Sequence, residues 1–220
     1  FSVTTNGLGP VPGALEAAKE ALLTIEHYPP SDFEPAITDL AEFLSPHDSA
    51  DMRSRLLLGN GASEMIDMIS RLAPKGQWRP GPFTTQYQEY RRSATNAGRA
   101  ELHWSDVGAK LTSIVNPCNP TGDYMHVEEI KEYISKTCDD NSWVVVDESM
   151  QPWAGPHWRE DSLTSQKEFI QEIQIHDDQA SPYTPGKLMC LSPSVMKDLH
   201  STVNFHVLCI YSSALQQPER

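Results

Sequence analysis

The chain has 220 residues and a formal net charge of −13, from 17 Lys and Arg against 30 Asp and Glu. A charge this negative repels phosphate backbones and anionic lipid at long range, and the densest basic cluster is the pair Arg91 and Arg92. We therefore expect no nucleic-acid partner and no membrane partner. The 39% of apolar residues is enough for a packed core.

The four cysteines lie far apart in the sequence and form no CxxC pair. They are Cys118, Cys138, Cys190 and Cys209. This spacing predicts no metal or redox framework. With no signal peptide at the N-terminus, it indicates thiols in a reducing compartment, so we expect a soluble, cytoplasmic protein.

Apolar residues recur at spacings of three and four over residues 13–27 and 35–44, which predicts two amphipathic helices. The short apolar run at residues 55–58 predicts a strand, followed by a glycine turn and a helix that includes residues 65–72.

The second half of the chain alternates in the same way. It predicts helices over residues 87–97 and 127–137 and strands over 100–104, 111–115 and 143–146. Such alternation predicts a three-layer α/β/α fold with a mostly parallel sheet, which binds ligands beyond the carboxyl ends of its strands. The pattern fades beyond Asp161, and the apolar stretch at 203–211 has no clear partner element.

The sequence GNGASE, residues 59–64, follows the first predicted strand. Its glycines allow a sharp turn, and the free N–H groups at the start of the next helix favour an anion such as a phosphate. A plain glycine turn with Ser63 as the helix cap is the alternative.

The sequence NPCNPTG, residues 116–122, follows the 111–115 strand. Its two prolines make a rigid loop that can aim the side-chain amide of Asn119 at a ligand. An ordinary proline turn is the alternative.

Asp147 stands at the end of the buried 143–146 strand. A buried carboxylate needs a positive partner or several hydrogen-bond donors, so this residue predicts a nearby cation such as a protonated ring nitrogen. A helix-capping Asp is the alternative.

Four motifs occur in the order GNGASE, Tyr87-x-x-Tyr90, NPCNPTG and VVVDE. Their order resembles that of the pyridoxal-phosphate-dependent aminotransferases of fold type I, class I and II. Within them the chain most resembles the branch of histidinol-phosphate aminotransferase and threonine-phosphate decarboxylase. The segments NGLGP and HYPP, at residues 6–10 and 27–30, are similar to that branch as well.

The resemblance implies a site for pyridoxal 5'-phosphate, which needs an anchored phosphate, a stacked ring and a protonated pyridine nitrogen. It implies that the phosphate is held at Gly61, Ala62 and Ser63. It also implies that Tyr28 reaches the phosphate of a neighbouring subunit's cofactor, and therefore that the full-length family is homodimeric.

The resemblance gives three further residues a role. It implies that Tyr87 stacks on the cofactor ring, that Asn119 bonds the phenolic oxygen, and that Asp147 pairs with the pyridinium nitrogen. The activity implied is transfer of an amino group between an amino acid and a 2-oxo acid.

The chain departs from the family pattern at two points. Ser149 and Met150 stand where the family usually has Ala and an aromatic residue. The family also requires a lysine that forms the Schiff base, in an S-x-[ST]-K setting followed by G-x-R-x-G. Lys167, Lys187 and Lys197 lack that setting, and Lys197 is the nearest imitation.

The C-terminal small domain of the family has no counterpart in the sequence. We expect residues 1–30 to form an arm and helix, 31–160 part of the cofactor-binding large domain, and 161–220 a divergent tail from a truncated or misassembled gene model or a splice variant. The leading hypothesis is an aminotransferase-like protein that is incomplete or inactive. The alternatives are a decarboxylase of phosphorylated amino acids and a non-catalytic fragment or partner subunit.

Overall fold

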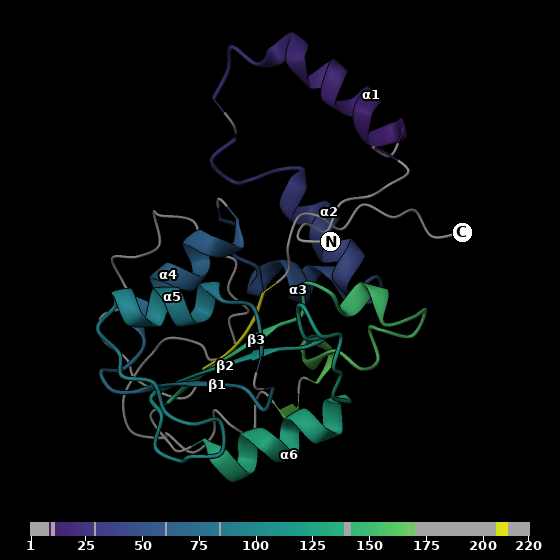
Figure 1. Ribbon diagram of the computed structural model, residues 1–220. Coiled ribbons are helices and arrows are strands. Elements are labelled where there is room, and N and C mark those ends of the chain that lie inside the picture. The colour runs from purple at the N-terminus through teal and green to yellow at the C-terminus, as the bar shows by residue number, and fades with distance from the viewer. Residues whose placement is uncertain are drawn as a thin grey trace, which may run out of the picture.

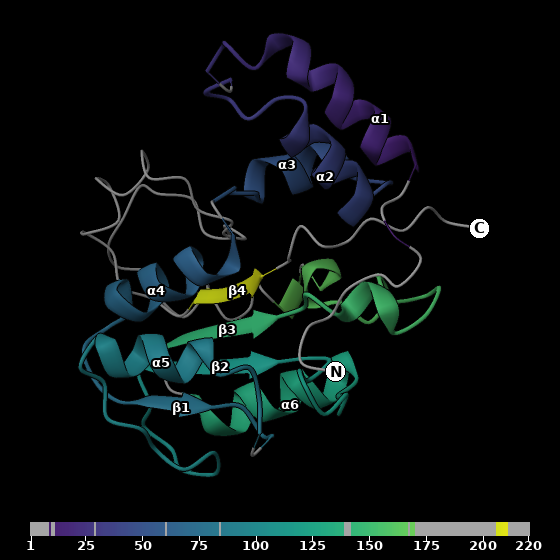
Figure 2. The ribbon, with the colours of Figure 1, turned by 45° about the horizontal axis from the view of Figure 1, so that its top comes forward.

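The fold is built on one parallel sheet with the strand order β1-β2-β3-β4. The computed structural model describes residues 9, 12–28, 30–59, 61–83, 85–138, 142–166, 168–169 and 206–210. Its strands are β1 (Trp78–Pro80), β2 (Leu111–Val115), β3 (Trp143–Asp147) and β4 (His206–Ile210). All neighbouring strands pair in parallel, so their carboxyl ends share one edge of the sheet, the edge that the arrowheads point to in Figure 2.

Helices cover both faces of the sheet, which confirms the predicted α/β class with its parallel sheet. One face packs against α4 (Ala62–Leu72) and α5 (Glu89–Asn96), and the other against α2 (Ala36–Leu44), α3 (Ser49–Arg55) and α6 (Val127–Thr137). In Figure 1, α6 lies on the opposite side of the strands from α4 and α5. All five residues of β2 and of β3 are buried, as expected for strands covered on both faces.

The alternation of side chains along β3 assigns each residue to one face. Trp143 and Val145 pack with α4 and α5, whereas Val144 and Val146 pack with α2, α3 and α6. Asp147 continues the first row and so faces α5.

The N-terminal arm stands apart from the sheet. It consists of α1 (Pro12–Ala21) and the 3₁₀ helix η1 (Leu22–Thr24), and no residue of η1 is buried. Figures 1 and 2 both show α1 away from the body that the sheet forms. The predicted helix at 13–27 is thus confirmed, but its α-helical part ends at Ala21 and a 3₁₀ turn follows.

Two predicted strands are wrong. At 55–58, Arg55 ends α3 and Leu56, Leu57 and Leu58 form a connector that packs against the core without pairing. At 100–104, only Glu101 pairs, through an isolated bridge to Trp78. Leu102 donates its N–H to the carbonyl of Trp78, but the next bond would require an N–H from Pro80, and proline has none.

The sequence analysis missed α3 and β1, because it predicted no helix over 49–55 and no strand over 78–80. The apolar stretch at 203–211, for which the sequence indicated no partner, contains β4, and β4 pairs with β3 over its whole length. No helix in the described ranges is both long and apolar enough to cross a membrane.

Glu148 ties the segment after the sheet to the core. It follows Asp147, is buried, and accepts hydrogen bonds from the Ser162 hydroxyl at 2.6 Å and the Leu163 backbone N–H at 2.9 Å. Leu163 is itself buried against the α2–α6 face and begins the 3₁₀ helix η3 (Leu163–Ser165). The packed domain therefore includes residues on both sides of Asp161, where the pattern of the sequence fades.

We expect Glu148→Ala to lower the free energy of unfolding by about 2–4 kcal/mol, because the buried Ser162 hydroxyl and Leu163 N–H lose a charged acceptor. Glu148→Gln keeps one acceptor oxygen and should lie between the two proteins. Chemical denaturation measures the difference. The control is Glu128→Ala on the exposed surface of α6, with an expected change below about 0.5 kcal/mol. A loss from Glu148→Ala no larger than the control's would contradict this role.

Candidate functional site

Asp147 is a deeply buried carboxyl group at the carboxyl edge of the sheet, on the face that α5 covers. It ends β3 and is 4% exposed. Its Oδ2 accepts a hydrogen bond from the Tyr90 hydroxyl at 3.0 Å, and its Oδ1 accepts one from the Ser149 backbone N–H at 3.0 Å. The carboxyl group therefore has a fixed orientation. It caps no helix, so the alternative drawn from the sequence does not apply.

Burial raises the pKa of Asp147 above its ordinary value, although the hydrogen bonds from Ser149 and Tyr90 act in the opposite direction. Within the described part of the chain, no Lys, Arg or His forms an ion pair with this carboxylate. A positively charged ligand atom would supply the partner that a buried carboxylate needs. Asp147 thus has the chemistry of a cation-binding group.

Tyr90 lies in the first turn of α5 and bonds Asp147 from the helical layer, and Tyr87 lies two residues before this helix begins. Their rings meet edge to face with centroids 6.5 Å apart. Tyr87 is half-buried and packs against the same apolar cluster as Val115 and Val145, near the carboxyl edge. Its ring is therefore held on the face of the sheet that Asp147 occupies.

Sequence reasoning assigned no function to Tyr90, although its hydroxyl is a direct partner of Asp147. The spacing of Tyr87-x-x-Tyr90 was the available signal, because the sequence predicted both in one helix, where residues three apart share a face.

The start of α4 lies on the same face as Asp147. Gly61 is the N-cap, with φ +96°, a conformation that glycine adopts far more readily than other residues. Ala62 packs against the apolar cluster that includes Val145, whereas Ser63 is exposed. Ser63 is the second residue of the helix and not its cap, so its hydroxyl and the N–H groups of the first turn can serve an anion.

The loop that carries Asn119 begins beside Asp147. The Asn116 backbone N–H donates to the Asp147 carbonyl at 2.9 Å. The side chain of Asn116 closes the loop, because it donates to the Met125 carbonyl at 2.9 Å and accepts from the Met125 N–H at 2.8 Å. Both ends of the Asn116 side-chain amide are therefore used within the loop. Asn119 is the other asparagine of the loop and the candidate for a ligand contact.

Asn119 lines a pocket of about 500 Å³ that also reaches Met150. Met150 stands where the resemblance places an aromatic residue. No described residue forms a hydrogen bond with the Asn119 side chain.

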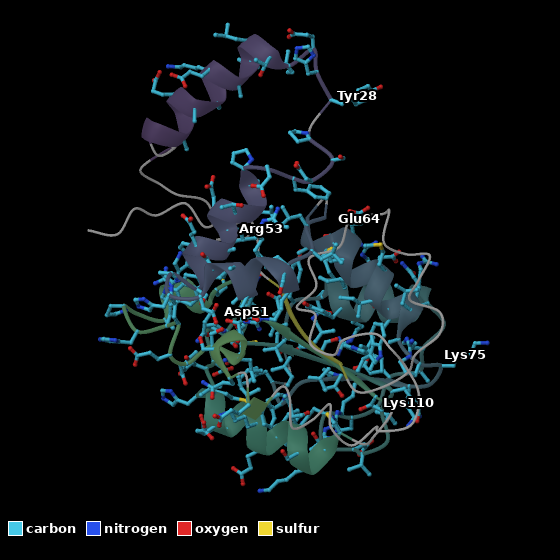
Figure 3. All side chains as sticks on the ribbon, turned by 180° about the vertical axis from the view of Figure 1, so that it is seen from behind. Tyr28, Asp51, Arg53, Glu64, Lys75 and Lys110 are labelled. Carbon is cyan, nitrogen blue, oxygen red and sulfur yellow. The ribbon has the colours of Figure 1, made fainter. Side chains whose placement is uncertain are left out.

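One residue of the predicted site, Tyr28, is not brought to this edge, and the Schiff-base candidate lies outside the described residues. Tyr28 lies on the N-terminal arm, is 97% exposed, and points away from the sheet in Figure 3. Lys197 lies outside the described residues, as do Lys167 and Lys187. No group of three or more His, Cys, Asp or Glu in the described ranges could hold a metal ion.

The structure thus defines an α/β protein with a parallel sheet between helical layers and a polar site at the carboxyl edge of its strands. Residues 2–154 match the family described as aminotransferase class I and II, and the chain belongs to this family. The resemblance read from the sequence motifs is therefore confirmed.

Individual relatives agree with this assignment. The chain is 29% identical over 167 residues to a histidinol-phosphate aminotransferase of Methanothermobacter thermautotrophicus, which covers 68% of this chain and 43% of the relative. The chain thus spans less than half of that relative's length.

Solved structures share the fold. One is the histidinol-phosphate aminotransferase of Sinorhizobium meliloti in complex with pyridoxal-5'-phosphate, with a TM-score of 0.53, 17% identity, and coverage of 66% of this chain and 42% of that one. Another is the L-threonine-O-3-phosphate decarboxylase of Porphyromonas gingivalis, with a TM-score of 0.51, 21% identity, and coverage of 68% and 47%.

We expect Asp147→Asn to make the cofactor-free protein more stable at neutral pH. The folded-state pKa of Asp147 is raised, so its contribution to stability is fully present below the unfolded-state pKa and is lost as pH rises through the folded-state pKa. The amide keeps the shape and cannot ionise, so the variant should lack this loss. Denaturation at several pH values between about 4 and 8 measures it.

Tyr90→Phe is the matched comparison, because it removes one donor and leaves the carboxyl group. The pKa of Asp147 should rise further in this variant, so the loss of stability should begin at the same pH as in the wild type, continue to a higher pH and be larger in total. Identical pH dependence in the wild type and in Asp147→Asn would contradict the account.

Proposed function

We propose that this chain carries the pyridoxal-phosphate site of an aminotransferase-like protein, at the carboxyl edge of β2 and β3. The observation that carries the proposal is the buried carboxylate of Asp147, which has fixed hydrogen bonds and no cationic partner in the described part of the chain. A protonated pyridine nitrogen is a cation with one N–H donor, and it can form a charge-assisted hydrogen bond with such a carboxylate. In a complete site of this class, the reaction is amino-group transfer between an amino acid and a 2-oxo acid.

The residues present fit this cofactor. Asp147 would keep the pyridine nitrogen protonated, and the half-buried ring of Tyr87 would lie against the cofactor ring on the α5 side. The amide of Asn119 would donate to the phenolic oxygen. When bound, pyridoxal phosphate supplies an electron sink for bonds to the α-carbon of an amino acid.

The phosphate would lie at the start of α4. Gly61 turns the backbone, and the N–H groups of Ala62 and Ser63 lie at the positive end of the helix dipole. The Ser63 hydroxyl is exposed and adds a further donor. Glu64 is in the same first turn, and Figure 3 labels it at the N-terminal end of α4. Because a carboxylate repels a phosphate, we place the phosphate at the N–H groups of Ala62 and Ser63.

We propose that the cofactor binds without a covalent bond to a lysine. Lys167, Lys187 and Lys197 lack the S-x-[ST]-K setting of the family. Among the described lysines, Lys75 and Lys110 precede β1 and β2 at the amino edge of the sheet, and Lys131 and Lys136 lie on α6. These observations support the incomplete site over a working aminotransferase, and no described residue favours the decarboxylase alternative.

Addition of pyridoxal 5'-phosphate to the purified chain, followed by absorbance spectroscopy before and after borohydride, tests the proposal. We expect saturable binding, an absorbance that borohydride does not fix to the protein, and affinity at least about tenfold lower in Asp147→Asn because a charge-assisted hydrogen bond is lost. Glu128→Gln on α6 is the control.

The possible results separate the hypotheses. Absence of binding would overturn the cofactor proposal and support a non-catalytic fragment. A borohydride-reducible bond that is lost in Lys197→Ala would overturn the view that no lysine serves, and would make Lys197 the covalent partner.

We also propose that the arm forms a contact with a second copy of the chain, in the cytoplasm, where free thiols such as Cys118 and Cys138 stay reduced. Leu22 is 62% exposed and Leu23 is 80% exposed. Tyr28, also on the arm, is 97% exposed, so the arm carries several apolar side chains that the chain's own sheet does not cover.

We expect Leu22→Ser/Leu23→Ser to weaken self-association at least tenfold, since two leucines lose their burial at the interface. Sedimentation equilibrium measures this, with Lys19→Ser on α1 as the control. A wild-type chain that stays monomeric at tens of micromolar, or a double variant that associates like the control, would contradict the proposed contact.

A further inference from the structure

A pocket of about 500 Å³ lies at the carboxyl ends of β2 and β3 and shares only Asn119 with the residues proposed to hold the cofactor. Its volume is typical of small-molecule sites. Its lining residues come from the 117–124 loop and from the segment after β3. They are Pro117, Cys118, Asn119, Pro120, Gly122, Tyr124, Met150, Trp153 and Ala154.

The walls of this pocket, which we call the Trp153 pocket, are neutral and largely apolar. None of its lining residues is Lys, Arg, Asp or Glu. Trp153 is 47% exposed, and Met150 adds a polarisable thioether beside it. Indole rings and thioethers both make favourable contacts with aromatic rings, so the composition favours a flat aromatic group.

Hydrogen bonds hold these walls in place. The Tyr124 hydroxyl donates to Asp161 and accepts from Gln151 Nε2 at 2.9 Å. The hydroxyl proton of Tyr124 is used in the bond to Asp161, so Tyr124 offers the pocket its ring and no hydrogen-bond donor. Gln151 is fully buried and starts the 3₁₀ helix η2 (Gln151–Trp153), so the same network positions Trp153.

Asn119 supplies one polar contact to the pocket. Its side-chain amide has no hydrogen-bond partner among the described residues, in contrast to Asn116, whose amide is used on both sides by Met125. A neutral amide can donate to a carboxylate or keto oxygen. A ligand could therefore place an oxygen at Asn119 and a ring between Trp153 and Tyr124.

We propose that the Trp153 pocket receives the aromatic side chain of an amino acid or 2-oxo acid, and so makes the preferred substrate aromatic. This assignment rests on the proposed function, because Asn119 would place the reacting end of the substrate beside the cofactor. A phosphorylated side chain would meet no cation in this pocket, so the pocket does not suit the phosphorylated substrates in the names of the relatives.

Calorimetric titration of the chain with phenylpyruvate, pyruvate and histidinol phosphate, with and without pyridoxal phosphate, tests this specificity. We expect phenylpyruvate to bind at least about tenfold more tightly than pyruvate, since only phenylpyruvate can stack. Trp153→Ala should remove that preference and Trp153→Phe should keep most of it. Trp104→Phe, on the loop before β2, is the matched control. The indole N–H resonance that disappears in Trp153→Phe should shift when phenylpyruvate is added.

Three results would overturn the proposal: equal affinity for phenylpyruvate and pyruvate, an unchanged preference in Trp153→Ala, or tighter binding of histidinol phosphate than of phenylpyruvate. Cofactor absorbance in the same samples separates the two proposals. Cofactor binding without aromatic preference rejects the Trp153 pocket alone. Aromatic preference without cofactor binding supports the pocket and rejects the cofactor site.

Discussion

Burial of β3 on both faces is the constraint on which the rest of the domain depends. Each of its five residues is buried, so the strand requires a helical layer on each side. α4 and α5 supply one layer, and α2, α3 and α6 supply the other. Asp147 and Glu148, at the end of the strand, therefore face different helical layers, because consecutive side chains point to opposite faces.

Asp147 and Glu148 show what that division does to two neighbouring acids. Glu148 faces the layer that contains Leu163, where a hydroxyl and a backbone N–H meet its two oxygens. Asp147 faces α5, where its donors leave its pKa raised. One acid is therefore satisfied within the chain and serves the fold. The other has no cationic partner in the described part of the chain, which makes it the candidate functional acid of the pair.

The sequence predicted those features that depend on local pattern. The strand at 111–115 and the helix at 127–137 are confirmed with identical bounds, since their apolar periodicity is unambiguous. The apolar runs at 55–58 and 100–104 gave the wrong element, because pairing depends on a partner strand, and the partner β1 ends in Pro80. The burial of Asp147 followed from its place after an apolar run. Its bonds to Tyr90 and Ser149, and the walls of the Trp153 pocket, depend on tertiary packing that a single sequence does not encode in a readable pattern.

The two ends of the Asn119 loop explain why a short segment can contribute to two sites. Asn116 fixes the beginning of the loop to Met125 and to the Asp147 carbonyl. Cys118 adds a second anchor, since its thiol donates to the Thr85 carbonyl at 3.1 Å and burial raises its pKa, which keeps it a neutral thiol. A loop held in this way presents Asn119 at a constant position in the pocket that Trp153 also lines. Met150, which stands where the family usually has an aromatic residue, lines the pocket on the side of the segment after β3. If both proposals hold, Asn119 contacts the cofactor and the substrate, so the proposals together predict that cofactor affinity and side-chain selectivity are coupled through this loop.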